Sequence, residues 1–430
     1  MSSCVSSPFN AIINYDDVYV EPLILSALQS RLPPNSYKVI TSLSDHSFQD
    51  TPCLQWRSYE SLDFDVALSS PSTCLINSYI YRKAVTRKHY LSTTISNWIV
   101  KHPTSLLKHH YKPTVVFELD YAEFLDDALT EADSWDLRMS MKANLAREGN
   151  DREYWILKPG MSDRGQGIRL FSTETDLMSI FEGWEAEQPD SDEDEIDESL
   201  SMQEDANEKD YLVVSDLRHF IAQPYISNPL LLASLSNPPH KFHLRTYVVA
   251  VGALKVYIYR PLLALFAASS YRPPYESDEL QRHLTNTCLQ TESGSGRAHD
   301  GSVRLFWDLP SSVPGLGLDW KDFVFDQICA VTAETFTAAS REMVTHFQPL
   351  PCAFEIFGLD FLVDQSGQAW LLEVNAFPDF KQTGEDLKDV VQGLFEEVID
   401  VAVKPFFGIE GKAPTMGMMR QVLNLDLGRR

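Results

Sequence analysis

The chain has 430 residues, of which 44% are hydrophobic and 11% aromatic, so it can form two or three packed units. Its net charge is −25 and no basic stripe is visible, which argues against general nucleic-acid binding. The six cysteines are scattered without a C-x-x-C pair, so we expect free thiols and no zinc site.

Residues 9–75 are predicted to form a small N-terminal α/β unit, and residues 76–110 are predicted to be mainly helical. Short apolar runs indicate strands, and one stretch with helical spacing ends at Pro33-Pro34. The predicted strands are 11–13, 38–40 and 66–68, and the predicted helix is 20–32.

From residue 113 onward strands dominate, with helices between them, a mixture typical of an α/β or α+β enzyme. The predicted strands are 114–119, 154–158, 168–171, 219–226, 242–251, 254–259, 357–363 and 370–374. The predicted helices are 121–147, 323–343 and about 385–403, and residues 270–303 are expected to be loop-like. The expected domains are 1–75, 76–222 and 223–430.

The strand at 154–158 leads into a glycine-rich loop. Gly160 and Gly165 have the spacing of a Walker loop, but Gln166-Gly167 stands where Lys-Ser or Lys-Thr would follow. Lys158 instead precedes the loop, at the end of the strand. Because small residues let backbone N–H groups approach phosphate oxygens, Lys158 and this loop are candidates for phosphate binding. The alternative is a plain hairpin.

Residues 181–210 hold fourteen acidic residues and one lysine, and so contribute −13 to the net charge. A run of like charges with few apolar residues cannot offset its ordering entropy. We therefore predict a disordered insert at about 185–210, which is either an interaction segment for a basic partner or a solvated loop without a role.

The strand at 242–251 presents two different faces. Alternation places Lys241, His243, Arg245 and Tyr247 on one face and apolar residues on the other. A turn at 252–253 would pair Arg245 with Arg260 on the next strand. Two opposed arginines are destabilising unless an anion, such as a γ-phosphate or a carboxylate, lies between them. The alternative is that both reach solvent or structural carboxylates.

The last predicted hairpin carries two carboxylates. A turn centred on residues 366–367 would pair Leu362 with Leu371 and Asp360 with Glu373, with Asn375 on the same face as the acids. Buried like charges at this spacing are costly unless a cation joins them. Oxygen ligands on a rigid hairpin suit Mg²⁺, so we predict a magnesium site here. The alternative is that each acid has a separate structural partner.

Three weaker candidates remain. Residues 223–226 could present backbone groups to an adenine edge. The other two are the polar loop 283–286 and Lys88 on a predicted helix.

Together these segments resemble the tubulin-tyrosine-ligase-like family of ATP-grasp enzymes over about residues 75–378. The resemblance rests on K-P-x-x-x-x-x-G-x-G at 158–167, K-F-x-L-R-x-Y at 241–247, H-L-T-N at 283–286, and F-G-x-D-F-L-x-D with L-L-E-V-N at 357–375. Within the family, the chain is similar to the fungal branch associated with P-bodies.

The resemblance implies an ATP-grasp fold with an N-terminal domain of the pre-ATP-grasp type, and ATP with two Mg²⁺ ions as cofactors. It implies a ligase that adds an amino acid to a protein through an acylphosphate, with the addition of tyrosine to the α-tubulin tail as the typical reaction. The scattered cysteines and an N-terminus without a signal-peptide pattern separately predict a cytoplasmic protein. The implied partners are the tubulin tail or another acceptor and mRNA-decay proteins, without a membrane or direct nucleic-acid contact. The implied ATP-binding residues are Lys88, Lys158, Gly165, Gln166, Gly167, Gln223, Ile226, Lys241, His243, Thr285 and Asn286; the implied catalytic residues are Lys241, Arg245 and Arg260; the implied Mg²⁺ ligands are Asp360, Glu373 and Asn375.

Two positions depart from the family pattern. His243 stands where most members carry an aspartate that contacts the nucleotide, and Pro224 replaces a commonly basic residue. Tubulin tails are acidic, as is this chain, so a groove for them would depend on a few bases such as Arg82 and Arg87. A second hypothesis is therefore a weakly active or inactive ATP-grasp domain that serves as an interaction module in P-bodies. A third is a ligase unrelated to tubulin.

Overall fold

The computed structural model describes residues 8–42, 51–162, 165–187, 214–285, 302–383, 387–410 and 417–428. The described residues form two compact units. The first comprises those of Met1–Tyr111, Asn228–Tyr271 and Gln281–Arg430, and the second those of Lys112–Ser227 and Arg272–Leu280. The domain boundaries expected at residues 75 and 222 stay predictions. Most of the predicted acidic insert, residues 188–210, and Asn286 lie outside the described residues.

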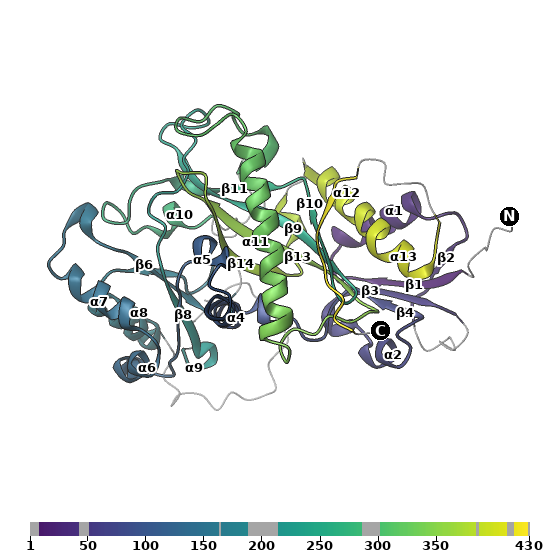
Figure 1. The fold of residues 1–430 in the computed structure, drawn as a ribbon, viewed down its shortest axis with the longest axis horizontal. Coiled ribbons are helices and arrows are strands. Elements are labelled where there is room, and N and C mark those ends of the chain that lie inside the picture. Colours follow the sequence, from purple (N-terminus) through teal and green to yellow (C-terminus); the bar gives the residue numbers. More distant parts are fainter. Residues whose placement is uncertain are drawn as a thin grey trace, which may run out of the picture. The chain divides into compact units, whose positions relative to one another are not determined.

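The N-terminal sheet of the first unit is parallel, with the strand order β2-β1-β3-β4. Helix α1 packs on one face, where its apolar side chains meet Phe9, Ala11 and Trp56, and helix α2 lies on the opposite face (Figure 1). The elements are β1 (Phe9–Asn14), α1 (Val20–Arg31), β2 (Tyr37–Val39), β3 (Cys53–Arg57), α2 (Phe64–Ser69) and β4 (Cys74–Ile76).

One predicted strand of this sheet is wrong. Residues 66–68 belong to helix α2, because the Asp63 side chain accepts a hydrogen bond of 2.9 Å from the Val66 N–H and so caps the first helical turn. An apolar run of three residues does not distinguish a strand from a helix. The sheet instead uses β3 and β4, which the sequence patterns did not predict.

The second sheet of the first unit is antiparallel and is organised around the long strand β9 (His240–Val251). The first half of β9 pairs with β11, its second half pairs with β10, and its other edge pairs with β13. The remaining strands are β10 (Lys255–Tyr259), β11 (Leu263–Ser270), β12 (Val303–Leu305), β13 (Phe354–Val363), β14 (Ala369–Ala376) and β15 (Met419–Asn424).

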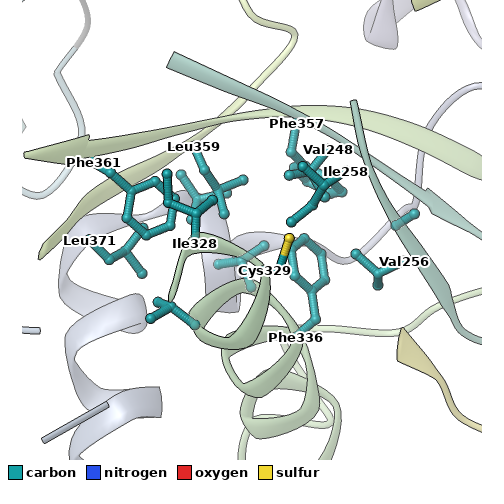
Figure 2. Close-up of a cluster of buried hydrophobic side chains, with 14 of the residues drawn as sticks. Val248, Val256, Ile258, Ile328, Cys329, Phe336, Phe357, Leu359, Phe361 and Leu371 are labelled. Atoms are coloured by element: carbon teal, nitrogen blue, oxygen red, sulfur yellow. The ribbon is translucent and has the colours of Figure 1, made fainter. Parts of the chain in front are cut away.

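Helix α11 (Trp320–Glu342) covers one face of this sheet. Figure 2 shows Ile328, Cys329 and Phe336 of α11 against side chains from β9, β10, β13 and β14. On β9, Phe242, Leu244 and Val248 point into this core, as the alternation predicted. Further along the opposite face, Tyr247 and Val249 pack in a second core with α1 and α12 (Lys388–Val398). The first half of that opposite face is therefore where polar side chains lie.

The second unit contains a four-stranded antiparallel sheet with the order β5-β8-β6-β7. Helix α8 (Glu174–Ala186), which was not predicted, begins with a capping box in which Thr173 and Asp176 satisfy each other's backbone N–H groups. The other elements are β5 (Val115–Glu118), α6 (Leu125–Glu131), α7 (Trp135–Asn144), β6 (Trp155–Pro159), β7 (Arg169–Phe171), α9 (Val214–Leu217) and β8 (His219–Pro224).

Helices α3 (Lys83–Thr86), α4 (Lys88–Lys101) and α5 (Leu107–His110) agree with the helical prediction for residues 76–110, and α12 with the π-helical turn at Ile399–Val403 agrees with that for about 385–403. Helix α10 (Leu280–His283) lies within residues 270–303, which were expected to be loop-like, and α13 (Lys404–Phe407) follows the last predicted helix. Within the described part of the chain, no helix combines the length and apolar character needed to cross a bilayer. The mixed α/β class expected from the sequence is confirmed.

Candidate active site

The β13–β14 hairpin places Asp360 directly opposite Glu373, as predicted. The predicted pair Leu362–Leu371 is wrong, because the register shifts between Asp360 and Phe361 and Leu362 faces Trp370 instead. The shift leaves Leu372 as an extra residue on β14, which is a β-bulge. Two-residue turn geometry therefore predicted the acid pair correctly and the pairs nearer the turn incorrectly.

The hairpin turn is held by one buried carboxylate. Asp364 accepts hydrogen bonds from the Ser366 hydroxyl (2.6 Å), the Ser366 and Gln368 N–H groups (2.9 and 3.1 Å) and the Trp370 indole (2.9 Å). Burial alone would raise the pKa of Asp364, but these donors lower it. Gly367 adopts φ +80°, a left-handed conformation that favours glycine.

The Asn375 side chain connects the two acids of the hairpin. Its Nδ2 lies 3.3 Å from Asp360 Oδ2 and 3.1 Å from Glu373 Oε1. Asp360 is buried, whereas about a fifth of the Glu373 side chain is exposed. The three side chains implied as Mg²⁺ ligands are thus brought together on one face, and the acids do not point apart.

Arg245 of β9 neutralises Asp360. The two residues are register partners between β9 and β13, and the guanidinium donates two hydrogen bonds to the carboxylate, from Nε at 2.5 Å and from Nη2 at 3.1 Å. Burial alone would raise the pKa of Asp360, but Arg245 and the nearby His243 hold it well below its ordinary range. Burial alone would lower the pKa of Arg245, and the same pairing raises it above its usual value.

Lys88 neutralises Glu373. Its Nζ lies 3.3 Å from Glu373 Oε2, and it is the first residue of helix α4. Each acid of the hairpin therefore has its own basic neighbour, while Asn375 contacts both. Lys241, two positions before His243 on β9, is buried and lies on the same face of the strand as Arg245.

His243 links the strand to the predicted polar loop. Its Nδ1 is hydrogen-bonded to the Thr285 hydroxyl, and its Nε2 lies 3.5 Å from Asp360 Oδ1. Both His243 and Thr285 are buried. The structure therefore brings Thr285 to the site through His243.

The predicted Arg245–Arg260 pair is wrong. Lys255, and not Leu254, pairs with Val251, so the turn has three residues and the register is shifted by one. Arg245 lies between Leu263 of β11 and Asp360 of β13. Arg260 instead pairs with Asp322 at 3.2 Å and stacks over the Trp307 ring at 4.2 Å. The catalytic role of Arg260 stays a prediction that none of these contacts supports.

In the second unit, the predicted phosphate lysine and adenine segment are neighbours. Lys158 Nζ donates a hydrogen bond of 2.9 Å to Gln223 Oε1, and Gln223 donates one of 2.7 Å to the Thr114 hydroxyl. Lys158, Gln223 and Ile226 are all buried. The loop glycines Gly165 and Gly167 have φ values of +81° and +70°, and a turn at Gly165–Ile168 contains Gln166.

Gly358 is a further residue of the site that the sequence motifs did not single out. A Cβ atom at this position would lie 3.0 Å from Pro378 Cβ and 3.2 Å from Arg245 Cδ. The Arg245 side chain therefore passes over β13 because residue 358 has no side chain. A glycine inside an otherwise apolar strand was the available signal.

The donor set of the hairpin fits magnesium better than a softer metal. The two carboxylates offer oxygen ligands, and Asn375, whose Nδ2 faces both acids here, could add its Oδ1. Mg²⁺ commonly takes few protein ligands beside water and phosphate. Across the described ranges, no group of three or more His, Cys, Asp or Glu side chains is arranged as a metal site. The site thus fits an ion shared with phosphate oxygens, with Arg245 and Lys88 close by.

Comparison with known proteins agrees with this geometry. The sequence pattern of the tubulin-tyrosine ligase family matches residues 67–408. A probable tubulin–tyrosine ligase of Schizosaccharomyces pombe is 41% identical over 409 residues, which cover 94% of each chain. The probable tubulin–tyrosine ligase PBY1 of Saccharomyces cerevisiae is 41% identical over 90% of this chain, which spans 51% of that protein.

A solved structure is similar over nearly the whole chain. It is the C-terminal domain of K. lactis Pby1, described as an ATP-grasp enzyme interacting with the mRNA decapping enzyme Dcp2. It is 35% identical, covers 97% of this chain and 100% of its own, and has a TM-score of 0.69. The expected fold and the resemblance to the fungal branch are confirmed, and the chain belongs to the tubulin-tyrosine ligase family of ATP-grasp proteins.

Proposed function

We propose that this protein is an ATP-dependent carboxylate–amine ligase that adds an amino acid to a protein through an acylphosphate. The observation that carries the proposal is the convergence of Asp360, Glu373 and Asn375 on one face of a rigid hairpin. Structural roles alone do not require an amide that contacts two opposed carboxylates beside an arginine and a lysine.

In this proposal Asp360, Glu373 and the amide oxygen of Asn375 hold magnesium. When bound, Mg²⁺ neutralises the charge that develops on the β- and γ-phosphate oxygens of ATP. Lys88 and Lys158 bind phosphate oxygens, with Gly165, Gln166 and Gly167 offering backbone N–H groups. Gln223 and Ile226 flank adenine. Lys241, His243, Thr285 and Asn286 complete the nucleotide site.

Arg245 has the central role in orienting the substrate carboxylate. Its side chain is only 12% exposed, its guanidinium is fixed by two hydrogen bonds to Asp360, and it cannot lose its proton. A fixed cation stabilises the negative charge of the attacking carboxylate and of the tetrahedral intermediate without reorganising. The carboxylate forms a bond to the γ-phosphorus as the bond to ADP breaks, and an amine then displaces phosphate to form the amide.

The acceptor and the location are further parts of the proposal. The names of the two yeast relatives support a tubulin tail or another protein as the acceptor, and a free amino acid as the donor. The interaction of K. lactis Pby1 with Dcp2 supports a cytoplasmic protein of P-bodies with mRNA-decay proteins as partners.

A transfer assay tests the ligase. The purified chain is incubated with Mg-ATP and labelled tyrosine, glutamate or glycine, together with tubulin or whole lysate. Glu373→Gln removes one charge from the site, whereas Glu60→Gln removes one from an exposed position in the short 3-10 helix Tyr59–Ser61 that follows β3. We expect labelled protein with the wild type and Glu60→Gln, and none with Glu373→Gln.

A second candidate function is an interaction module without turnover. It is favoured by the ion pairs at the site, since Arg245 already neutralises Asp360 and Lys88 already neutralises Glu373. His243 in place of the usual aspartate favours it too. The interaction module is the better description if the wild type binds ATP and a decapping protein but transfers no label to any acceptor. That result would rule out the ligase.

A further inference from the structure

A cavity of about 620 Å³ lies on the N-terminal sheet, in the first unit and away from the β13–β14 hairpin in the sequence. It is lined by residues from β1, from the segment that follows β2, and from the end of β3 to the start of α2. None of these residues belongs to the nucleotide or metal site proposed above.

The cavity occupies the position where open parallel sheets bind ligands. The chain moves from β1 outward to β2 and then back across to β3, so the direction of strand order reverses between β1 and β3. The two connecting helices lie on opposite faces, as Figure 1 shows for α1 and α2. At such a reversal the connections leave a crevice at the carboxyl ends of the strands. Arg57, the last residue of β3, lines the cavity there.

Arg57 supplies a cation to this cavity. Asn77 accepts a hydrogen bond from the Arg57 N–H and donates one to its carbonyl, both 2.9 Å, so the backbone is clamped. The Nε atom of the side chain is buried and has no hydrogen-bond partner in the described part of the chain. A buried donor without a partner is costly, which favours an anionic ligand at this position.

Two acids line the cavity beside this cation. Asp63 caps helix α2, and Asp65 in the first turn is exposed. A phosphate group in this cavity would be attracted by one guanidinium but repelled by two carboxylates, so the charges disfavour phosphate. The loop after β1 also offers no glycines for a phosphate, and carries Asp16 and Asp17 instead. The charges thus suit a ligand with one anionic and one cationic group.

The lining also includes three apolar side chains, beside the hydroxyl groups of Thr41, Ser42 and Ser61. Ile12 and Leu62 are buried and Phe64 is half-buried, and all three line the cavity. The volume falls in the range of sites that enclose small organic ligands. From these features we infer that the cavity binds a free α-amino acid with a large apolar side chain. Its carboxylate pairs with Arg57, and its ammonium pairs with Asp65 beside Asp63. This site goes beyond the proposed ligase function, because it uses none of the hairpin residues.

Calorimetric titration of the whole chain, without nucleotide or magnesium, tests the site. The probes are L-phenylalanine, phenylethylamine, which lacks the carboxylate, and 3-phenylpropionate, which lacks the ammonium group. We expect saturable binding of phenylalanine and about tenfold weaker binding of each analogue. Arg57→Gln should weaken phenylalanine about tenfold and leave phenylethylamine unchanged, whereas Asp65→Asn should weaken phenylalanine and leave 3-phenylpropionate unchanged.

Matched controls separate these effects from a general change of charge. Lys38→Gln and Glu60→Gln remove exposed charges of the same domain outside the cavity lining and should bind phenylalanine like the wild type. If Arg57→Gln no longer unfolds cooperatively, and so is not properly folded, Arg57→Lys and Asp65→Asn are used for the titration instead. No saturable binding up to about 10 mM, tighter binding of inorganic phosphate or AMP than of phenylalanine, or wild-type affinity in both site variants overturns the inference. Because ATP is absent, a failed ligase assay has no bearing on this result.

Discussion

Arg245 and Asp360 are direct partners across the β9–β13 pair, and two hydrogen bonds join the largely buried Arg245 side chain to the buried Asp360 carboxylate. Backbone register and side-chain pairing therefore fix the same two residues. Arg245 on β9 therefore sets the position of Asp360, one of the candidate metal ligands. The contribution of this ion pair to stability can be measured by replacing Arg245.

Arg245→Met should destabilise the protein by about 3–5 kcal/mol, because it leaves the Asp360 carboxylate buried without its cation. Arg260→Met is the control, since the Arg260–Asp322 pair is exposed and should contribute about 1 kcal/mol or less. Urea unfolding of both variants measures the difference. An equal loss of unfolding free energy in the two variants would show that another group neutralises Asp360.

Gly358→Ala should destabilise the protein by about 1–3 kcal/mol and lower any ligase activity, because the added methyl group displaces Arg245 or Pro378. Gly183→Ala is the matched control. Gly183 lies inside helix α8 with open space around its Cβ position, so alanine there should stabilise by about 0.5–1 kcal/mol. Thermal unfolding and the transfer assay test both variants, and a fully active Gly358→Ala would contradict the close approach.

Asp364→Ala should cost about 2–3 kcal/mol near neutral pH, since four donors of the hairpin turn lose their acceptor. The lowered pKa of Asp364 means that this contribution is present above the ordinary aspartate pKa and is lost as the pH falls. The gap between variant and wild type should therefore narrow in acid. Asp426→Ala, which removes one exposed turn acceptor, should change stability by about 0.5 kcal/mol or less.

Glu355→Gln should reduce the pH dependence of stability between about pH 4.5 and 7. Burial raises the pKa of Glu355 from 4.5 to about 7, although Arg82 at 2.9 Å opposes the shift. The native state then retains a proton that the unfolded state releases, so this residue makes stability fall as the pH rises through that window. Urea unfolding at several pH values measures the slope, with Glu60→Gln as the control. An unchanged slope in Glu355→Gln would contradict the raised pKa.

Local patterns in the sequence predicted most of the elements and the chemistry of the hairpin. Strict alternation predicted the two faces of β9, and a glycine near the turn predicted the opposition of Asp360 and Glu373. Patterns of this kind depend on the periodicity of the backbone, which can be recognised within a single segment of the sequence. The bulge at Leu372 and the three-residue turn before Lys255 escaped prediction, because an inserted residue changes the register without changing the alternation that a short window shows.

The order of motifs along the chain was sufficient to determine the family and the fold class, since each motif carries residue types that its local chemistry requires. Only the tertiary structure decided which charges meet. Arg245 pairs with Asp360, Lys88 with Glu373 and Arg260 with Asp322, although each pair is far apart in sequence. The cavity beside Arg57 also depends on strand order, because parallel strands bring their carboxyl ends together only after the sheet has formed. Contacts between distant segments result from packing and register, and no local pattern specifies them.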